Sequence, residues 1–193
     1  MDYPAQLELD GDNRIANWRP LVHWLLGIPH LIITNVLGNV AGVVGLISWF
    51  AIVFTGALPP GLANFQCLII RYSARTYSYV LWLREAYPPF AFEMTPGDPG
   101  GDPLRVAFQP ALYDRNRLTV ALRLIWAIPA ALFAFVLSLA IMAVSFVSFF
   151  AVLFTGQYPL GMRDFVVRAM RFCVRASAYW YLLTDEYPPL RVE

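Results

Sequence analysis

The segment FAIVFTG at residues 50–56 recurs as FAVLFTG at residues 150–156, at an offset of 100 positions. Both segments close a long apolar run and lead into a turn. The match extends to residue types whose backbone preferences or charge cannot be exchanged for those of aliphatic residues. These pairs are Pro29/Pro129, Pro59/Pro159, Gly61/Gly161, Phe65/Phe165, Arg71/Arg171, Arg75/Arg175 and Tyr79/Tyr179. The chain is therefore an internal repeat, and its fold should be read as two similar halves.

The repeat also sets the expected domain boundaries. No gap is needed between residues 28 and 89, and YPP at 87–89 matches YPP at 187–189. The halves meet in TPGDPGGDP at residues 95–103, which is dense in turn-forming residues and predicts a solvent-exposed linker. We therefore expect a first membrane repeat at 1–94, a linker at 95–103 and a second membrane repeat at 104–193.

Composition places the chain near membrane proteins. Of 193 residues, 59 % are hydrophobic and 14 % are charged, against about 45–50 % and about 25 % in soluble domains. Such hydrophobicity excludes intrinsic disorder. A net charge of +1 argues against a nucleic-acid partner. Two cysteines cannot build a disulfide framework or a cysteine zinc site.

Two apolar runs are long enough to enter a membrane. No Asp, Glu or Arg interrupts residues 21–54 or residues 124–154. About 20 apolar residues suffice to cross a bilayer, so each run is too long for one upright span. Each run is either a long bent helix with an interfacial start before its proline or a hairpin that turns near Gly38 and Asn39. The second half has no turn signal at the matching position, which favours the bent helix.

After each run comes an amphipathic segment, at residues 62–83 and 162–183. Arg168, Arg171 and Arg175 follow Asp164 at helical spacing, so the four side chains share one face. Arg71 and Arg75 occupy the same stripe in the first half. Such a stripe can lie among lipid head groups, can pair with acidic residues such as Asp164, or can form a pocket for an anion or a lipid head group. The candidate lipid or anion contacts are Arg71, Arg75, Arg168, Arg171 and Arg175.

Short alternating segments lie at the ends of each half, at residues 5–9, 90–94, 104–109 and 190–192. Together they could form a small four-stranded sheet. The expected fold is an all-α integral membrane protein. It consists of a tandem repeat of a long apolar helix and an arginine-striped amphipathic helix, with short β-strands at the repeat ends, and the halves pack about a pseudo-two-fold axis.

The repeated pattern also resembles a known family, the bacterial domain of unknown function 4389, in two tandem copies that cover nearly the whole chain. The residues that carry the resemblance are Ile28-Pro29-His30, residues 49–56, Pro59, Gly61, Phe65, Arg71, Arg75, Tyr79 and residues 87–90 in the first copy, with residues 154–159, Gly161, Asp164, Phe165, Arg171, Arg175, Tyr179 and residues 184–189 in the second. The resemblance implies a membrane protein and supplies no activity. The expected location is the bacterial cell membrane, as a multi-pass protein.

The sequence shows no paired nucleophile and base, so we expect a protein that is not an enzyme. His23 and His30 share a helix face but lack further ligands nearby, and no metal or cofactor is expected. The leading expectation is an accessory or scaffold subunit of a larger membrane complex or a homo-oligomer, with the bilayer, other membrane subunits or itself as partners. The alternative is an anionic-lipid-binding or membrane-shaping protein that uses the arginine helices. A membrane enzyme using His30, Asp185 or Glu186 is the remaining alternative.

Overall fold

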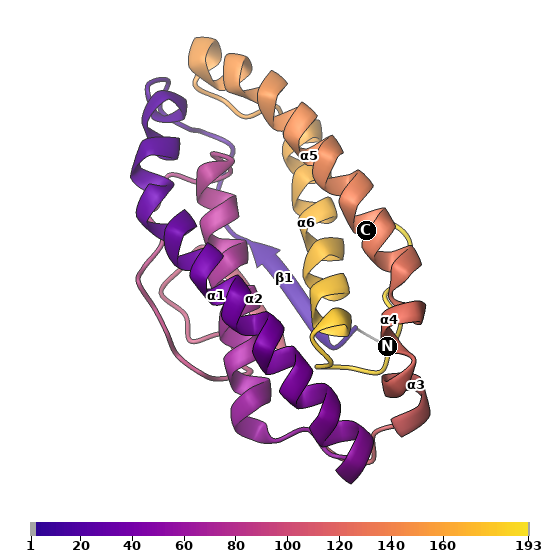
Figure 1. Ribbon diagram of the computed structural model, residues 1–193. Helices are drawn as coiled ribbons and strands as arrows, with labels where there is room; N and C mark the ends of the chain where they lie inside the picture. The colour runs from indigo at the N-terminus through magenta and orange to yellow at the C-terminus, as the bar shows by residue number, and fades with distance from the viewer. Residues whose placement is uncertain (1–2, 193) are drawn as a thin grey trace.

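The computed structural model describes residues 3–192 (Figure 1). Its elements, in chain order, are β1 (Ala5–Leu9), α1 (Arg19–Thr55), α2 (Pro60–Val80), β2 (Leu104–Phe108), α3 (Arg117–Ala121), α4 (Arg123–Trp126), α5 (Ile128–Thr155) and α6 (Leu160–Trp180). The protein is therefore mostly helical. Each half consists of a strand, a long apolar helix or broken helix, and a 21-residue amphipathic helix.

The two halves lie antiparallel, so that the end of each long helix meets the segment that begins the helices of the other half. The end of α1 meets the segment before α3, where the Arg115 amide donates to the Gly56 carbonyl at 3.0 Å. The end of α5 meets the segment before α1, where the Ile15 amide donates to the Gly156 carbonyl at 3.0 Å. α1 and α5 consequently run in opposite directions (Figure 1). The predicted pseudo-two-fold relation between the halves matches this arrangement.

α1 is one continuous helix of 37 residues that contains Pro29. Gly38 and Asn39 lie within it without a break, so the hairpin alternative is wrong. In the second half the corresponding stretch is interrupted at Leu122 and again at Ala127, which separates α3, α4 and α5. Pro129 falls in the first turn of α5, where its missing N–H leaves no helical hydrogen bond unmade.

The outer helices expose many of their large apolar side chains and bury several polar ones. In α1 a single stripe faces inward, and it carries small or polar residues such as His23, Gly27, His30, Thr34 and Ser48. The opposite face is apolar and exposed, with Leu21, Ile32, Val43 and Phe54 all more than half exposed. α5 shows the same inversion: Ser145 and Ser148 are buried while Phe135 and Phe146 are exposed. Each outer helix therefore exposes a long apolar face, while its buried stripe mixes small or polar residues with Ile52 in α1 and with Leu137, Ile141 and Val152 in α5.

The strands are exchanged between the halves. β1 and β2 pair antiparallel with Leu7 opposite Val106 at the centre. β1 belongs to the first half but packs on α6, and β2 begins the second half but packs on α2. The expected four-stranded sheet is wrong, because residues 90–94 and 190–192 form no strand. Two strands suffice here because the two amphipathic helices cover one face of the pair.

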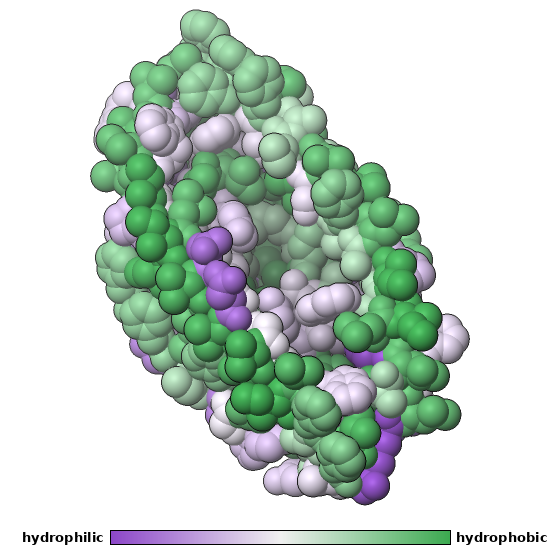
Figure 2. Space-filling view, in the orientation of Figure 1, coloured by the Kyte–Doolittle hydropathy of each residue, from purple (hydrophilic) through white to green (hydrophobic). Residues whose placement is uncertain are grey.

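The molecule therefore has three layers with opposite surfaces. α1 and α5 form the outer layer, α2 and α6 the middle layer, and the β1–β2 pair the third. Figure 2 shows the side of the outer layer, which is hollowed between the halves: hydrophobic side chains predominate along both rims, while a few hydrophilic side chains lie beside the hollow and paler ones within it. On the third layer the side chains of Glu8, Asp10 and Arg105 are more than half exposed. Within residues 3–192, Arg19–Thr55 and Arg123–Thr155 are helical segments long and apolar enough to cross a membrane.

Candidate functional site

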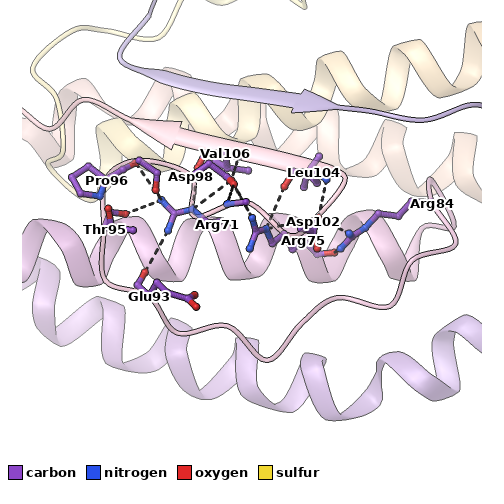
Figure 3. Close-up of polar contacts among 12 residues, drawn as sticks. Arg71, Arg75, Arg84, Glu93, Thr95, Pro96, Asp98, Asp102, Leu104 and Val106 are labelled. Atoms are coloured by element: carbon purple, nitrogen blue, oxygen red, sulfur yellow. Dashed lines mark hydrogen bonds and ion pairs between the residues drawn. The ribbon is translucent and has the colours of Figure 1, made fainter.

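The predicted arginine stripe is the best defined polar feature of the molecule, and in the first half it points inward (Figure 3). Arg71 is 3 % exposed. Its Nε donates to the carbonyl of Val106 in β2 at 2.9 Å. Its other nitrogens donate to four carbonyls between α2 and β2, those of Glu93 at 3.4 Å, Thr95 at 2.8 Å, Pro96 at 3.2 Å and Gly97 at 2.8 Å. One guanidinium thus fastens both the linker and the exchanged strand to α2.

One turn later, Arg75 continues the same attachment. It is 4 % exposed, and its Nε donates to the Leu104 carbonyl of β2 at 3.2 Å. Its Nη2 lies 3.1 Å from each carboxylate oxygen of Asp98. Asp98 also accepts the Val106 amide at 2.7 Å. Arg75 therefore reaches β2 twice, directly and through Asp98.

A third arginine, which the stripe did not include, completes the cluster. Arg84 is 5 % exposed and donates to Asp102, whose side chain is fully buried. Asp102 also accepts the Leu104 amide at 2.8 Å. The prediction of a solvent-exposed linker is therefore wrong for its two aspartates, because they are the counter-ions of the buried arginines. Its glycines at 97, 100 and 101 remain exposed.

The electrostatics of this cluster follow from burial. Desolvation lowers the pKa of Arg71 and of Arg84 from the usual arginine value, and the facing aspartates oppose that shift. Arginine nevertheless stays charged in proteins. Buried charges need hydrogen-bond partners, and here carbonyls and aspartates supply them for most donors, although Nε of Arg84 has none among the described residues. The cluster holds elements together and leaves little of either guanidinium to contact lipid.

The second half places its stripe differently. Arg171 is half-buried, and its Nε donates to the Leu7 carbonyl of β1 at 3.1 Å, as Arg71 does to β2. Arg175 is also half-buried and lies 5.6 Å from the ring centre of Tyr3. Arg168 is exposed, and the expected Asp164–Arg168 ion pair is not formed. The predicted contact of these arginines with lipid or an anion stays a prediction.

Another cluster closes the second half on the side of α3 and α4. Asp185 pairs with Arg115 at 2.7 Å and with Arg123. Arg123 also stacks over Tyr179, 3.9 Å from its ring centre. Burial raises the pKa of Asp185, but hydrogen bonds and charge from the two arginines outweigh it, so its pKa lies below the ordinary value. No periodicity in the sequence marks Arg115 or Arg123, because both lie outside the regular helices that produced the stripe.

Position 23 in the first half, which corresponds to Arg123 in the second, holds a histidine. His23 stacks on Tyr79 with ring centres 4.1 Å apart, and its Nδ1 lies 3.0 Å from the Tyr79 carbonyl. His30 is enclosed by aromatic rings, with Phe90 stacked at 4.2 Å and the Tyr72 hydroxyl 2.7 Å from its Nδ1. Both histidines are fully buried and pack against α2 and the segment after it. Within the described part of the chain, no three histidine, cysteine or acidic residues gather as a metal site.

These clusters indicate structural roles more than chemistry. The buried arginines hold the linker and strands, and the histidines pack among aromatic rings. Comparison with known sequences agrees with the repeat: the family model described as Domain of unknown function (DUF4389) matches residues 17–91 and again residues 117–191. No curated protein and no solved structure matches the chain. The chain therefore belongs to the domain of unknown function 4389 family, as two tandem copies.

Proposed function

We propose that this protein is a non-enzymatic, lipid-binding and membrane-shaping protein whose outer layer, α1 and α5, lies in the plane of one leaflet. The observation that supports this proposal is the opposition of two faces. The outer layer exposes large apolar side chains along its whole length, and the third layer exposes Glu8, Asp10 and Arg105. An apolar layer opposite a charged layer matches a molecule that floats at the membrane surface.

The lengths support an in-plane placement over a spanning one. The exposed apolar face of α1 runs from Leu21 to Phe54, about 50 Å at 1.5 Å per residue. To fit this face inside a hydrocarbon core of about 30 Å, the helix would need a tilt of about 53°, beyond the roughly 0–40° seen for membrane helices. A spanning placement would also bring the third layer into the hydrocarbon. Each charged side chain there would cost at least about 2.5–3.5 kcal/mol near the membrane centre.

Symmetry supports the same placement. The two halves share a sequence pattern and are related by an approximate two-fold axis perpendicular to α1 and α5. If that axis lies along the membrane normal, both halves meet the same lipid environment, which suits their matching apolar faces. Two wide apolar helices in one leaflet displace lipid on that side only, which favours membrane curvature.

The depth profile along α1 tests this placement. Leu21, Ile32, Val43 and Phe54 are spaced by eleven residues and share the exposed face, since eleven residues make close to three helical turns. Each is replaced by cysteine in a background without the native cysteines, spin-labelled, and measured for contact with oxygen and with a water-soluble relaxation agent in proteoliposomes. We expect one similar shallow depth at all four positions and water exposure at Glu8→Cys. Deep central labels with shallow end labels would contradict the proposal.

Membrane shaping has a separate measurement. Liposomes with rising protein-to-lipid ratios are imaged by electron microscopy, and we expect smaller or tubular vesicles. Phe54→Ser and Phe154→Ser together reduce the apolar face at the ends of both outer helices, where these rings are 72 % and 76 % exposed. The double variant should bind and deform vesicles less while remaining folded. Equal deformation by the two proteins would contradict the role of this face.

A second candidate is the accessory or scaffold subunit of a membrane complex, including a homo-oligomer. The observation that favours it is the hollow between the halves on the apolar face (Figure 2), because a helix of another subunit could fill it. Native mass spectrometry of the chain extracted gently from its own membrane separates the candidates. A stoichiometric protein partner would favour the scaffold, and a lone chain with retained lipid would favour the membrane-shaping protein.

A further inference from the structure

A polar cavity of about 500 Å³ opens where α1 ends. It is lined by residues 55–57 at the end of α1 and by Tyr113, Asp114, Arg115 and Arg117 before and at the start of α3. Figure 1 shows this corner at the lower end of α1, beside α3. The cavity is an open hollow, because Thr55, Tyr113, Asp114 and Arg117 are exposed, so it suits a small polar group that stays partly in solvent.

The cavity exists because the two halves are not the same length at this corner. At the equivalent corner, where α5 ends, the Tyr158 amide donates to the Asn13 carbonyl and the Ile15 amide donates to the Gly156 carbonyl. Only Arg14 lies between these two bonded residues, 13 and 15. In the second half the equivalent bonds run from Leu58 to Leu112 and from Arg115 to Gly56, so two residues, 113 and 114, lie in between. The loop takes up the extra residue with Asp114 in the left-handed conformation, at φ 54°.

The opposing wall is also smaller on this side. Gln157, whose backbone forms a β-bridge with that of Arg14, stands in one corner, and the smaller Ala57 stands at the matching position in the other. Asn17 reaches within 2.7 Å of the Cβ position of Gly156, while at Gly56 the neighbour is the guanidinium of Arg117, 3.2 Å away. A short alanine and a longer loop therefore leave a hollow with Arg117 held over the end of α1.

The charges in this cavity are of two signs and are available to a ligand. Arg115 is already paired with Asp185, which it shares with Arg123. Arg117 and Asp114 are exposed, and neither forms an ion pair with another residue of the described chain. The C-terminal end of α1 adds a partial negative charge beside Asp114. A ligand that fits these charges carries an anion for Arg117 and a compact cation for Asp114.

We propose that this cavity binds a phosphoethanolamine group, with the phosphate on Arg117 and the ammonium on Asp114. The planar guanidinium offers paired donors to phosphate, and a primary ammonium can donate to the carboxylate, which a trimethylated choline cannot. A lipid head group is the source that the location favours. Phe54 and Leu118, next to the lining residues, are 72 % and 70 % exposed, so apolar side chains flank a cavity that would lie at head-group depth. This last point rests on the proposed placement of the outer layer in a leaflet.

The test uses the full chain in nanodiscs that contain equal amounts of phosphatidylethanolamine, phosphatidylcholine and phosphatidylglycerol. Native mass spectrometry counts the lipid retained after release. We expect phosphatidylethanolamine to be enriched, Arg117→Gln to reduce its retention about tenfold through the loss of charged hydrogen bonds, and Asp114→Asn to abolish the preference over phosphatidylcholine. The matched control is Arg14→Gln, an exposed arginine at the equivalent corner, which should change nothing.

A second variant tests the cavity without altering charge. Ala57→Gln introduces the residue that stands at the equivalent position 157 and narrows the cavity. It should also remove the preference for phosphatidylethanolamine. Free phosphoethanolamine added to the nanodiscs distinguishes the sources of the group. Displacement only at a large excess indicates a membrane lipid, and binding in detergent without any lipid indicates a soluble ligand of the same chemistry. Retention of all three lipids in equal amounts by the unaltered chain would overturn the proposal.

The depth profile of α1 keeps this result separate from the proposed function. A flat profile with no lipid preference refutes the phosphoethanolamine site alone. A profile that is deep at its centre refutes the in-plane placement, and the effects of Arg117→Gln and Asp114→Asn then decide the site independently.

Discussion

The two halves of this protein use the same arginine pair to different extents. Arg71 and Arg75 are buried and held by the linker and β2, whereas Arg171 and Arg175 are half-buried beside β1. The strand contact is common to both halves, since Arg71 and Arg171 each donate from Nε to a strand carbonyl. The surrounding linker is what differs. The arginine pair is therefore buried in the first half because residues 93–98 cover it and supply carbonyls and an aspartate as its partners.

The largest expected effect tests this difference directly. Arg71→Ala should lower the free energy of unfolding by about 3–5 kcal/mol, because it leaves the buried carbonyls that Arg71 binds without their donor, while Asp98 keeps only Arg75 as its cation. Arg171→Ala should cost clearly less. Reversible unfolding in detergent micelles, followed by circular dichroism, measures both. Arg168→Ala, at an exposed position of α6, is the control with no expected change, and equal losses from the first two variants would contradict the distinction.

The linker itself supplies the next prediction. Asp102→Asn removes the charge that faces Arg84 and weakens the acceptor of the Leu104 amide, so we expect a loss of about 2–4 kcal/mol. Limited proteolysis should then cut within residues 95–103 faster than in the unaltered protein, whose linker aspartates are held by arginines. Asp10→Asn, whose side chain is exposed on the third layer, serves as the matched control. An uncut linker in the Asp102 variant would show that Arg71 and Arg75 hold it without the Arg84–Asp102 pair.

We expect Asp185, in the second half, to make the stability of the fold depend on pH in the acid range. The pKa of Asp185 is lower in the folded protein than in the unfolded chain, so its two arginines stabilise the fold at pH values above the ordinary aspartate pKa of about 4. That contribution is lost as the pH falls through the lowered folded value. Thermal unfolding is compared between pH 6 and pH 3, from about two units above the ordinary aspartate pKa to about one unit below it, and should show a smaller pH dependence for Asp185→Asn. Parallel curves for the two proteins would refute the assignment.

The smallest effect compares the two cysteines. Cys67 in α2 is fully buried, and burial raises the pKa of its thiol to about 12. Cys173 in α6 is only partly buried, although burial raises the pKa of its thiol as well. A maleimide should therefore modify Cys173 first and Cys67 only on unfolding, which peptide mass spectrometry can follow. Faster labelling of Cys67 would show that α2 becomes accessible more readily than the buried contacts of Arg71 and Arg75 imply.

The sequence revealed the architecture better than the polar contacts. Repeats at a constant offset and runs of apolar residues are local patterns, so the halves, the two long helices and the amphipathic helices followed from them. The partners of Arg71 could not follow, because they are backbone carbonyls of residues 93–97, and every residue type carries a carbonyl. The linker was misread for a related reason: proline and glycine indicate turns, but they do not indicate whether the turns lie against a buried arginine.

The sequence did not indicate the β1–β2 pair or the cavity at the end of α1, and the reasons differ. Residues 5–9 and 104–108 are nearly one hundred positions apart, and pairing at such separation leaves no local signal. The cavity depends on one inserted residue near Asp114, where the offset between the halves changes from 99 to 100. Alignment of the helices alone passes over that change.

The exchanged strands have a consequence for how such a protein arises. A single copy of the repeat would carry an amphipathic helix whose strand-binding face is empty and a strand with no helix of its own to cover it. Two separate copies could satisfy each other by trading strands, as in a domain-swapped dimer. The chain described here is that dimer joined end to end, with residues 95–103 as the joint. Cutting the gene at this joint should therefore yield two polypeptides that are unfolded alone and assemble when they are made together.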